Sequence, residues 1–99
     1  MNIRVQSIHF NIDKKLLAFI EKKVEKLTQF YDRIIGCDVV LKLENASDTF
    51  SKISELRIAV PGYDLFVKEQ RKTFEEGVDC GIESLKKQLE KHKEKQRLN

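Results

Sequence analysis

The spacing of hydrophobic residues predicts two strands in the first half of the chain. Between residues 2 and 8, Ile3 and Val5 alternate with polar neighbours in a short run that is rich in β-branched residues. Gly36 then precedes the segment CDVVLKLEN, in which hydrophobic residues recur at every second position. The residues that share one face of this second strand are Cys37, Val39, Leu41 and Leu43.

A hairpin of two more strands is predicted in the middle of the chain. The segment NASDTFS, residues 45–51, has the composition of a turn, and a third strand follows it. The hydrophobic residues of this strand are Ile53, Leu56, Ile58 and Val60. Pro61-Gly62 ends it, and Tyr63 to Gln70 forms the fourth strand.

A first amphipathic helix is predicted over about residues 13 to 31. Asp13 is a suitable N-terminal cap, because its carboxylate can accept a hydrogen bond from the first free backbone amides. Hydrophobic residues then recur at spacings of three and four, which places them on one side of a helix facing a core. They are Leu16, Ile20, Val24, Leu27 and Tyr31.

A second helix is predicted from Phe74 to about Lys95. Thr73 and Glu76 match a capping box, and a continuous hydrophobic stripe follows at Phe74, Val78, Ile82, Leu85 and Leu89. The next position on that stripe is His92, and nothing apolar follows until Leu98. We therefore expect the last two turns to bury little, with His92 partly solvated and the basic end projecting beyond the sheet.

The order of these elements is β-α-β-β-β-α, which predicts the α+β class. We expect a two-layer sandwich with a four-stranded mixed sheet and two helices on one face. The crossover makes the first two strands parallel, and the hairpins make the others antiparallel. A chain of 99 residues corresponds to a single domain, residues 1–99, with a partly projecting basic helix end.

Composition narrows the class of protein further. The start of the chain has no signal-peptide pattern, and no apolar run is long enough to cross a membrane, so a cytoplasmic protein is expected. Cys37 and Cys80 are far apart and have no close Cys or His neighbours, which favours buried structural thiols and no metal site. Nucleophile elbows, phosphate-binding glycine loops and zinc-binding helix motifs are missing from the sequence. We expect no enzyme, no cofactor and no small-molecule substrate.

Positive charge is concentrated near the end of the chain. Six basic and two acidic residues lie between Lys86 and Arg97, a net charge of +4, whereas the whole chain carries +3. On the first helix, the side opposite the hydrophobic stripe carries Lys15, Lys22 and Lys26, with Lys23 at its flank and Phe19 in the same row. On the second helix, Lys87, Lys91 and Lys95 form a row with a spacing of four residues.

These lysine rows have two interpretations. Two cationic rows on adjacent helices are a plausible footprint for RNA phosphates, and His92 could add a phosphate contact. Lysine rows are also common on ordinary solvated helix faces, and Glu90 and Glu94 lie at pairing distance along the helix. Phe19 can likewise be a secondary packing contact, because a single aromatic residue is not a stacking array.

Three segments resemble one family. The segment KLTQFYDRIIGCDVVLKLEN, residues 26–45, closely resembles the ribosome hibernation-promoting factor family, also called the sigma-54 modulation or ribosome-associated inhibitor family. VPGYDLFVKEQ is similar to the family's last hairpin, and VDCGIESLKKQLEKHKEK is similar to its second helix. The matching residues in that helix are Asp79, Lys87, Gln88, Leu89, Lys91, His92 and Lys93.

The resemblance implies a protein that docks in the decoding channel of the small ribosomal subunit. Such a protein contacts ribosomal RNA, excludes messenger and transfer RNA, and inhibits translation in resting cells under stress or in stationary phase. The contact residues that the resemblance implies are Lys23, Lys26, Arg33, Lys87, Lys91, Lys93 and Lys95. Glu75 stands where relatives commonly have an aromatic residue. Longer relatives carry a further domain that pairs ribosomes, and this domain is not expected here.

Two functions therefore compete at this point. One is an RNA-docking translation inhibitor, and the other is a non-catalytic protein-binding or self-associating α+β module whose lysines only keep it soluble. An open sheet face would favour the second function.

Overall fold

A computed structural model describes residues 2–44 and 52–98, with side chains described through residue 93. The predicted turn at residues 45–51 lies outside the described residues. The elements are β1 (Asn2–Ile8), α1 (Lys14–Phe30), β2 (Gly36–Leu43), β3 (Lys52–Val60), β4 (Tyr63–Arg71) and α2 (Phe74–Leu98). Their order is the predicted one, and α2 ends a few residues later than expected.

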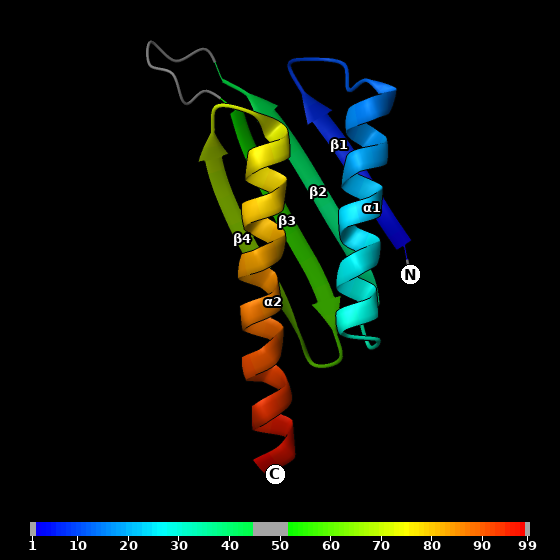
Figure 1. Cartoon of the computed structure of the whole chain (residues 1–99), viewed down its shortest axis with the longest axis vertical. Helices are drawn as coiled ribbons and strands as arrows, with labels where there is room; N and C mark the ends of the chain where they lie inside the picture. Colours follow the sequence, from blue (N-terminus) through cyan, green and yellow to red (C-terminus); the bar gives the residue numbers. More distant parts are fainter. Residues whose placement is uncertain (1, 45–51, 99) are drawn as a thin grey trace.

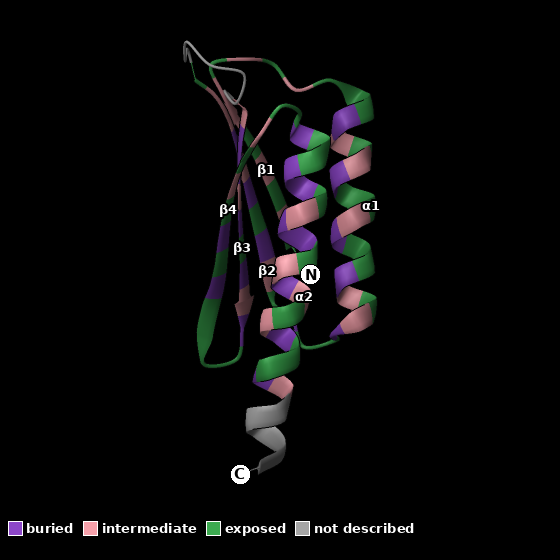
Figure 2. Cartoon of the chain, turned by 60° about the vertical axis from the view of Figure 1, so that its left-hand side comes forward, coloured by how far each residue is buried: buried purple, intermediate pink, exposed green. Residues whose placement is uncertain are grey.

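The four strands form one mixed sheet in the order β1-β2-β3-β4 (Figure 1). β1 and β2 are parallel because the α1 crossover joins them, whereas β2, β3 and β4 are antiparallel neighbours. Both helices cover the same face of the sheet, and Figure 2 shows their buried residues turned toward it. The predicted α+β two-layer sandwich is confirmed.

The core lies between the helices and this face of the sheet. One row across the strands is Val5, Val39, Leu56 and Val67, which are paired in register. The hydrophobic stripe of α1 packs against this core, with Ile20, Val24 and Leu27 fully buried. The stripe of α2 does the same, and its five predicted members are all buried.

Each helix begins at its predicted cap. The carboxylate of Asp13 accepts a hydrogen bond of 2.7 Å from the amide of Leu16. The hydroxyl of Thr73 accepts a bond of 3.1 Å from the amide of Glu76. The ring of Phe74 stacks on Phe10, with centroids 4.8 Å apart, so an aromatic contact closes this end of the core although Glu75 is exposed.

Two glycines bring α2 close to the sheet. A Cβ atom at Gly77 would lie 2.7 Å from the Ser54 hydroxyl oxygen, and one at Gly81 would lie 2.9 Å from a methyl group of Leu56. Glycine is unfavourable inside a helix by about 1 kcal/mol relative to alanine. The close approach of helix and strand at these two positions explains why it is nevertheless present.

The two cysteines differ in their surroundings. Cys37 is buried as predicted, and its burial, with a smaller contribution from Asp38, raises the pKa of its thiol to about 12. Cys80 is only half-buried, so the expectation of a buried thiol is wrong for this residue. Within residues 2–44 and 52–98, no helix is long and apolar enough to span a membrane.

Candidate nucleic-acid interface

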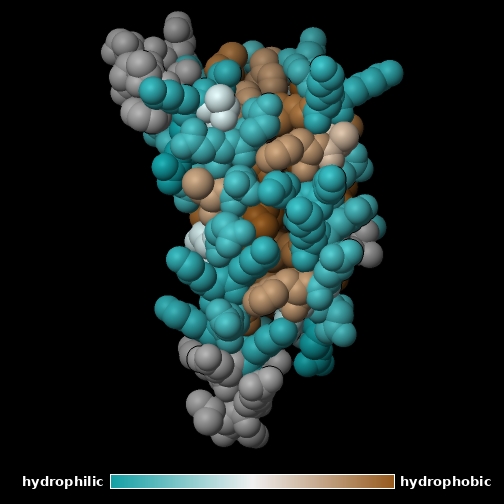
Figure 3. All heavy atoms as spheres, viewed as in Figure 1, coloured by the Kyte–Doolittle hydropathy of each residue, from teal (hydrophilic) through white to brown (hydrophobic). Residues whose placement is uncertain are grey.

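The outer surface of the two helices carries most of the predicted contact residues. α1 and α2 lie side by side, and in Figure 3 their outward face is largely hydrophilic, with hydrophobic side chains gathered between them. The exposed residues of this set are Lys15, Lys22 and Lys26 on α1, Arg33 in the loop that follows α1, and Lys87 and Lys91 on α2. The hydrophobic stripes face the sheet, so these cations point away from the core. We call this set the helical basic surface.

Lys23 links the two helices. Its ammonium group lies 2.8 Å from a carboxylate oxygen of Asp79 on α2 and 5.5 Å from the centroid of the Phe19 ring. The side chain is partly buried between these neighbours, so part of its charge is neutralised before any ligand arrives. Phe19 packs against the core at its edge, which favours the packing interpretation over base stacking.

His92 is buried, which corrects the expectation of a partly solvated residue. Only 5% of it is exposed, and its Nδ1 atom forms a hydrogen bond with the hydroxyl of Tyr63 at the start of β4. Its ring meets Tyr63 and Tyr31 edge-on, with centroids 4.6 Å and 6.0 Å away. The hydrophobic stripe of α2 therefore continues one turn further than the apolar residues alone indicated.

Lys93 is attached to the end of α1. Its ammonium group donates a hydrogen bond of 3.1 Å to the backbone carbonyl of Phe30, the last residue of that helix. The same ammonium lies 4.9 Å from the Phe30 ring centroid and 5.7 Å from that of Tyr31. We call Phe30, Tyr31, Tyr63, His92 and Lys93 the helix-end cluster.

The predicted contact residues therefore fall into three groups. Six cations form the exposed helical basic surface, and Lys23, His92 and Lys93 have partners within the protein. The side chain of Lys95 lies outside the described residues. Sequence reasoning missed Tyr31 and Tyr63 as partners of His92, although the position of His92 on the stripe after Leu89 was the available signal.

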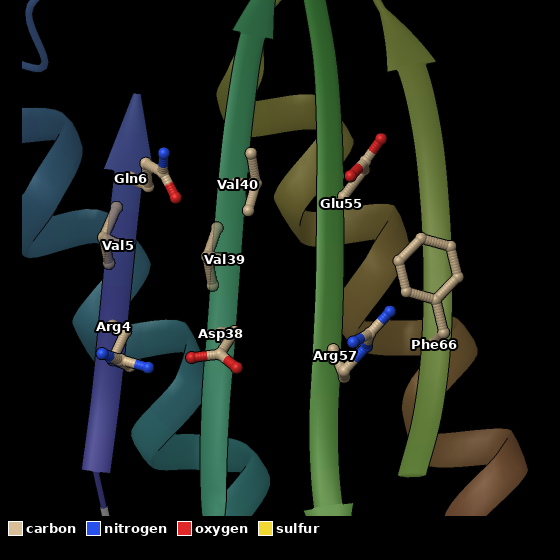
Figure 4. A pocket seen from close by; sticks show the side chains of 9 residues that line it. All are labelled: Arg4, Val5, Gln6, Asp38, Val39, Val40, Glu55, Arg57 and Phe66. Atoms are coloured by element: carbon tan, nitrogen blue, oxygen red, sulfur yellow. The ribbon is translucent and has the colours of Figure 1, made fainter. Parts of the chain in front are cut away.

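No helix in residues 2–44 and 52–98 covers the opposite face of the sheet. A shallow hollow of about 460 Å³ lies on it, and Figure 4 shows Arg4, Asp38, Arg57 and Phe66 side by side across the strands. The guanidinium of Arg57 lies 5.5 Å from the Phe66 ring centroid, and about half of Phe66 is exposed. Positive and negative groups alternate along this row.

Fold and surface together define a small α+β domain with a cationic two-helix face. The Sigma 54 modulation protein / S30EA ribosomal protein family matches residues 3–97, and the chain belongs to this family. It is 30% identical to the ribosome hibernation promoting factor of Escherichia coli K12 over 95 residues, which covers 96% of each protein. It is 23% identical to that of Pseudomonas putida KT2440, covering 97% of this chain and 90% of the relative.

The chain also matches a longer relative and two solved structures. The ribosome hibernation promotion factor of Bacillus subtilis is 25% identical, and the match covers 96% of this chain but 50% of that protein. A ribosomal subunit interface protein from Coxiella burnetii superposes with a TM-score of 0.82 at 22% identity, over 94% of this chain and 98% of that one. The N-terminal domain of Thermus thermophilus Protein Y superposes with a TM-score of 0.79 at 22% identity, over 93% and 99%.

Proposed function

We propose that this chain is a ribosome hibernation factor that binds ribosomal RNA of the small subunit through its helical basic surface. The observation that carries the proposal is the exposure of five cations along two adjacent helices, on the side that the core does not use, and of Arg33 in the loop that follows α1. The names of its relatives support the coarser part of the proposal, which is association with the ribosome during hibernation.

The chemistry of this surface suits a phosphate backbone. Lysine ammonium groups on exposed helices form point-charge contacts with phosphates and release condensed counterions when they do so. The proposed direct contacts come from the exposed set, with Lys95 added from its place in the sequence row. Lys23, His92 and Lys93 then support the surface from within, because the ammonium groups of the two lysines and Nδ1 of His92 already have partners.

The proposed mechanism is steric exclusion. A domain that occupies the decoding channel of the small subunit leaves no room for messenger and transfer RNA, and translation stops without any covalent chemistry. The family resemblance of residues 26–45 and of α2 supports this location. A channel lined by RNA would hold the domain because its phosphates attract the cations of the helical basic surface.

Salt dependence tests the proposal. If the bound protein neutralises about six phosphates, raising the salt concentration from about 50 mM to about 200 mM should weaken binding on the order of a thousandfold. Cosedimentation of the purified protein with small ribosomal subunits over this range measures the slope. Binding that does not change with salt would contradict phosphate docking.

A protein partner on the helix-free sheet face is the second candidate function. The observation in its favour is the uncovered hollow that contains Arg57 beside the half-exposed Phe66 ring, since arginine and aromatic residues are enriched in protein interfaces. Substitutions on this face separate the two functions, because they leave the helical basic surface unchanged.

A further inference from the structure

The basic end of α2 extends past the strands, so the sheet cannot hold all of it (Figure 1). We propose that His92 and Lys93 are positioning residues that lock this end of α2 against α1 and β4, and thereby align Lys91 with the lysines of α1. For its effect on RNA binding, this inference rests on the proposed function. The lock itself is a property of the free protein and can be measured without RNA.

His92 joins three elements at one point. Tyr31 directly follows α1, Tyr63 is the first residue of β4, and the buried imidazole lies against both rings. The bond between the Tyr63 hydroxyl and Nδ1 gives this contact a fixed direction, because a hydrogen bond weakens steeply when its geometry is lost. An apolar residue at position 92 would fill the same space without this orientation.

Lys93 completes the C-terminal end of α1. The last carbonyls of a helix have no partner within it, and they favour a nearby cation. The last turn of α1 has no basic residue of its own, and Lys93 of α2 donates to the Phe30 carbonyl instead. The rings of Phe30 and Tyr31 flank its ammonium group, so the bond is partly shielded from water.

Three successive residues therefore have different environments. Lys91 is exposed on the helical basic surface, whereas His92 is buried and Lys93 bonds to another helix. If the lock opens, Lys91 no longer keeps one position relative to Lys22 and Lys26. The apparent affinity for RNA is then the intrinsic affinity multiplied by the fraction of molecules that keep the binding-competent arrangement.

A matched pair of variants tests this division. Lys93→Met and Lys91→Met each remove one positive charge, at positions two residues apart, and keep a long flexible side chain. Lys93→Met should speed amide hydrogen exchange in the last turns of α2 by about three- to tenfold, because this is the effect expected from the loss of one hydrogen bond. Lys91→Met should leave this exchange unchanged, because its side chain is exposed.

Binding to purified small ribosomal subunits gives the second readout. Lys91→Met should weaken binding and reduce the salt slope by about one, as expected for the loss of a phosphate contact. Lys93→Met should weaken binding by about three- to tenfold with an unchanged slope, because the bound state keeps all its phosphate contacts. A purely structural substitution that unfolds the domain would instead abolish the circular dichroism signal.

Tyr63→Phe tests the hydrogen bond of His92 separately from the contacts of Lys93. It removes the hydroxyl and keeps the ring, and it should also speed exchange at the end of α2. In a His92→Ala background the same change should have no further effect, since the two residues act as a pair.

The outcomes are separable. If exchange at the end of α2 is unchanged in both Lys93→Met and Tyr63→Phe, the lock is wrong, whatever happens to binding. A reduced salt slope in Lys93→Met overturns it as well, because Lys93 then contacts a phosphate directly. If exchange rises as expected but no variant alters binding, Lys91→Met included, the proposed function is wrong and the alignment has no role in RNA binding.

Discussion

At the scale of single residues, chemical type alone does not assign a role in this protein. Lys23 and Lys26 are both lysines of α1, yet one is bound to Asp79 and the other is exposed. The two positions are three residues apart, which is about 60° around the helix, and only Lys23 lies within reach of Asp79 on α2. Residues that fold the domain and residues that bind its ligand can therefore be separated by substitution.

Leu85 and Lys91 give the clearest contrast. Leu85→Ala should lower the free energy of unfolding by about 2 to 5 kcal/mol, because it removes a fully buried side chain between α2 and the sheet. Lys91→Ala should change it by less than about 0.5 kcal/mol, since its side chain is exposed. Chemical denaturation of both variants measures these values. A change below about 0.5 kcal/mol for Leu85→Ala would mean that it is not a core residue.

Cys37 should make stability depend on pH above neutrality. Folding raises the pKa of its thiol from 9.0 to about 12, so the folded state favours the protonated form. The resulting stabilisation is complete below pH 9 and is lost as the pH rises toward 12. Between about pH 8 and about pH 10, Cys37→Ala should therefore lose less unfolding free energy than the unsubstituted protein does. Equal losses in both proteins would contradict a raised thiol pKa.

At the scale of elements, the predictions succeeded where a local signal marks a boundary. Asp13 and Thr73 act as helix caps in the structure, and Pro61-Gly62 joins β3 and β4 with Gly62 at a φ of 100°. Each signal works within three or four residues, so it can be read without knowing the fold. The parallel pairing of β1 and β2 followed from the α1 crossover between them.

Contacts between distant residues could not be predicted in the same way. Tyr63 and His92 are 29 positions apart, and Lys93 and Phe30 are 63 apart, so neither pair leaves a periodic signal. His92 was therefore expected to be partly solvated near the end of α2. The presence of Gly77 inside a helix is likewise explained only by the position of Ser54 on β3.

The glycine contact is itself testable. Gly77→Ala should destabilise the domain by about 1 to 3 kcal/mol, because the added methyl group overpacks the space against Ser54. Combining it with Ser54→Ala, which removes the hydroxyl that lies 2.7 Å from the new carbon, should recover much of this loss. Thermal unfolding of the two single variants and the double variant gives the coupling. Independent, additive effects would show that α2 is not held at this distance by the glycine.

At the scale of the whole molecule, the two faces arrange their charges differently. The helical basic surface brings six exposed cations together, beside exposed acidic residues of the helices such as Glu21 and Glu90, whereas Arg4, Asp38 and Arg57 alternate in sign on the sheet face. Lys42 and Glu55 on that face also pair with each other, 3.1 Å apart. A polyanion is attracted by the first arrangement more than by the second. The central claim is therefore that RNA binds the helices and not the open sheet.

Charge reversal on one face at a time tests this claim most directly. One variant carries Lys26→Glu, Lys87→Glu and Lys91→Glu on the helices, and the control carries Arg4→Glu, Arg57→Glu and Lys68→Glu on the sheet face. Both sets are exposed, and both change the net charge by the same amount. The measurement is binding to small ribosomal subunits and inhibition of a translation extract, with circular dichroism to confirm folding. We expect the helix variant to lose both activities and the control to keep them, whereas a folded helix variant with full potency would contradict the account.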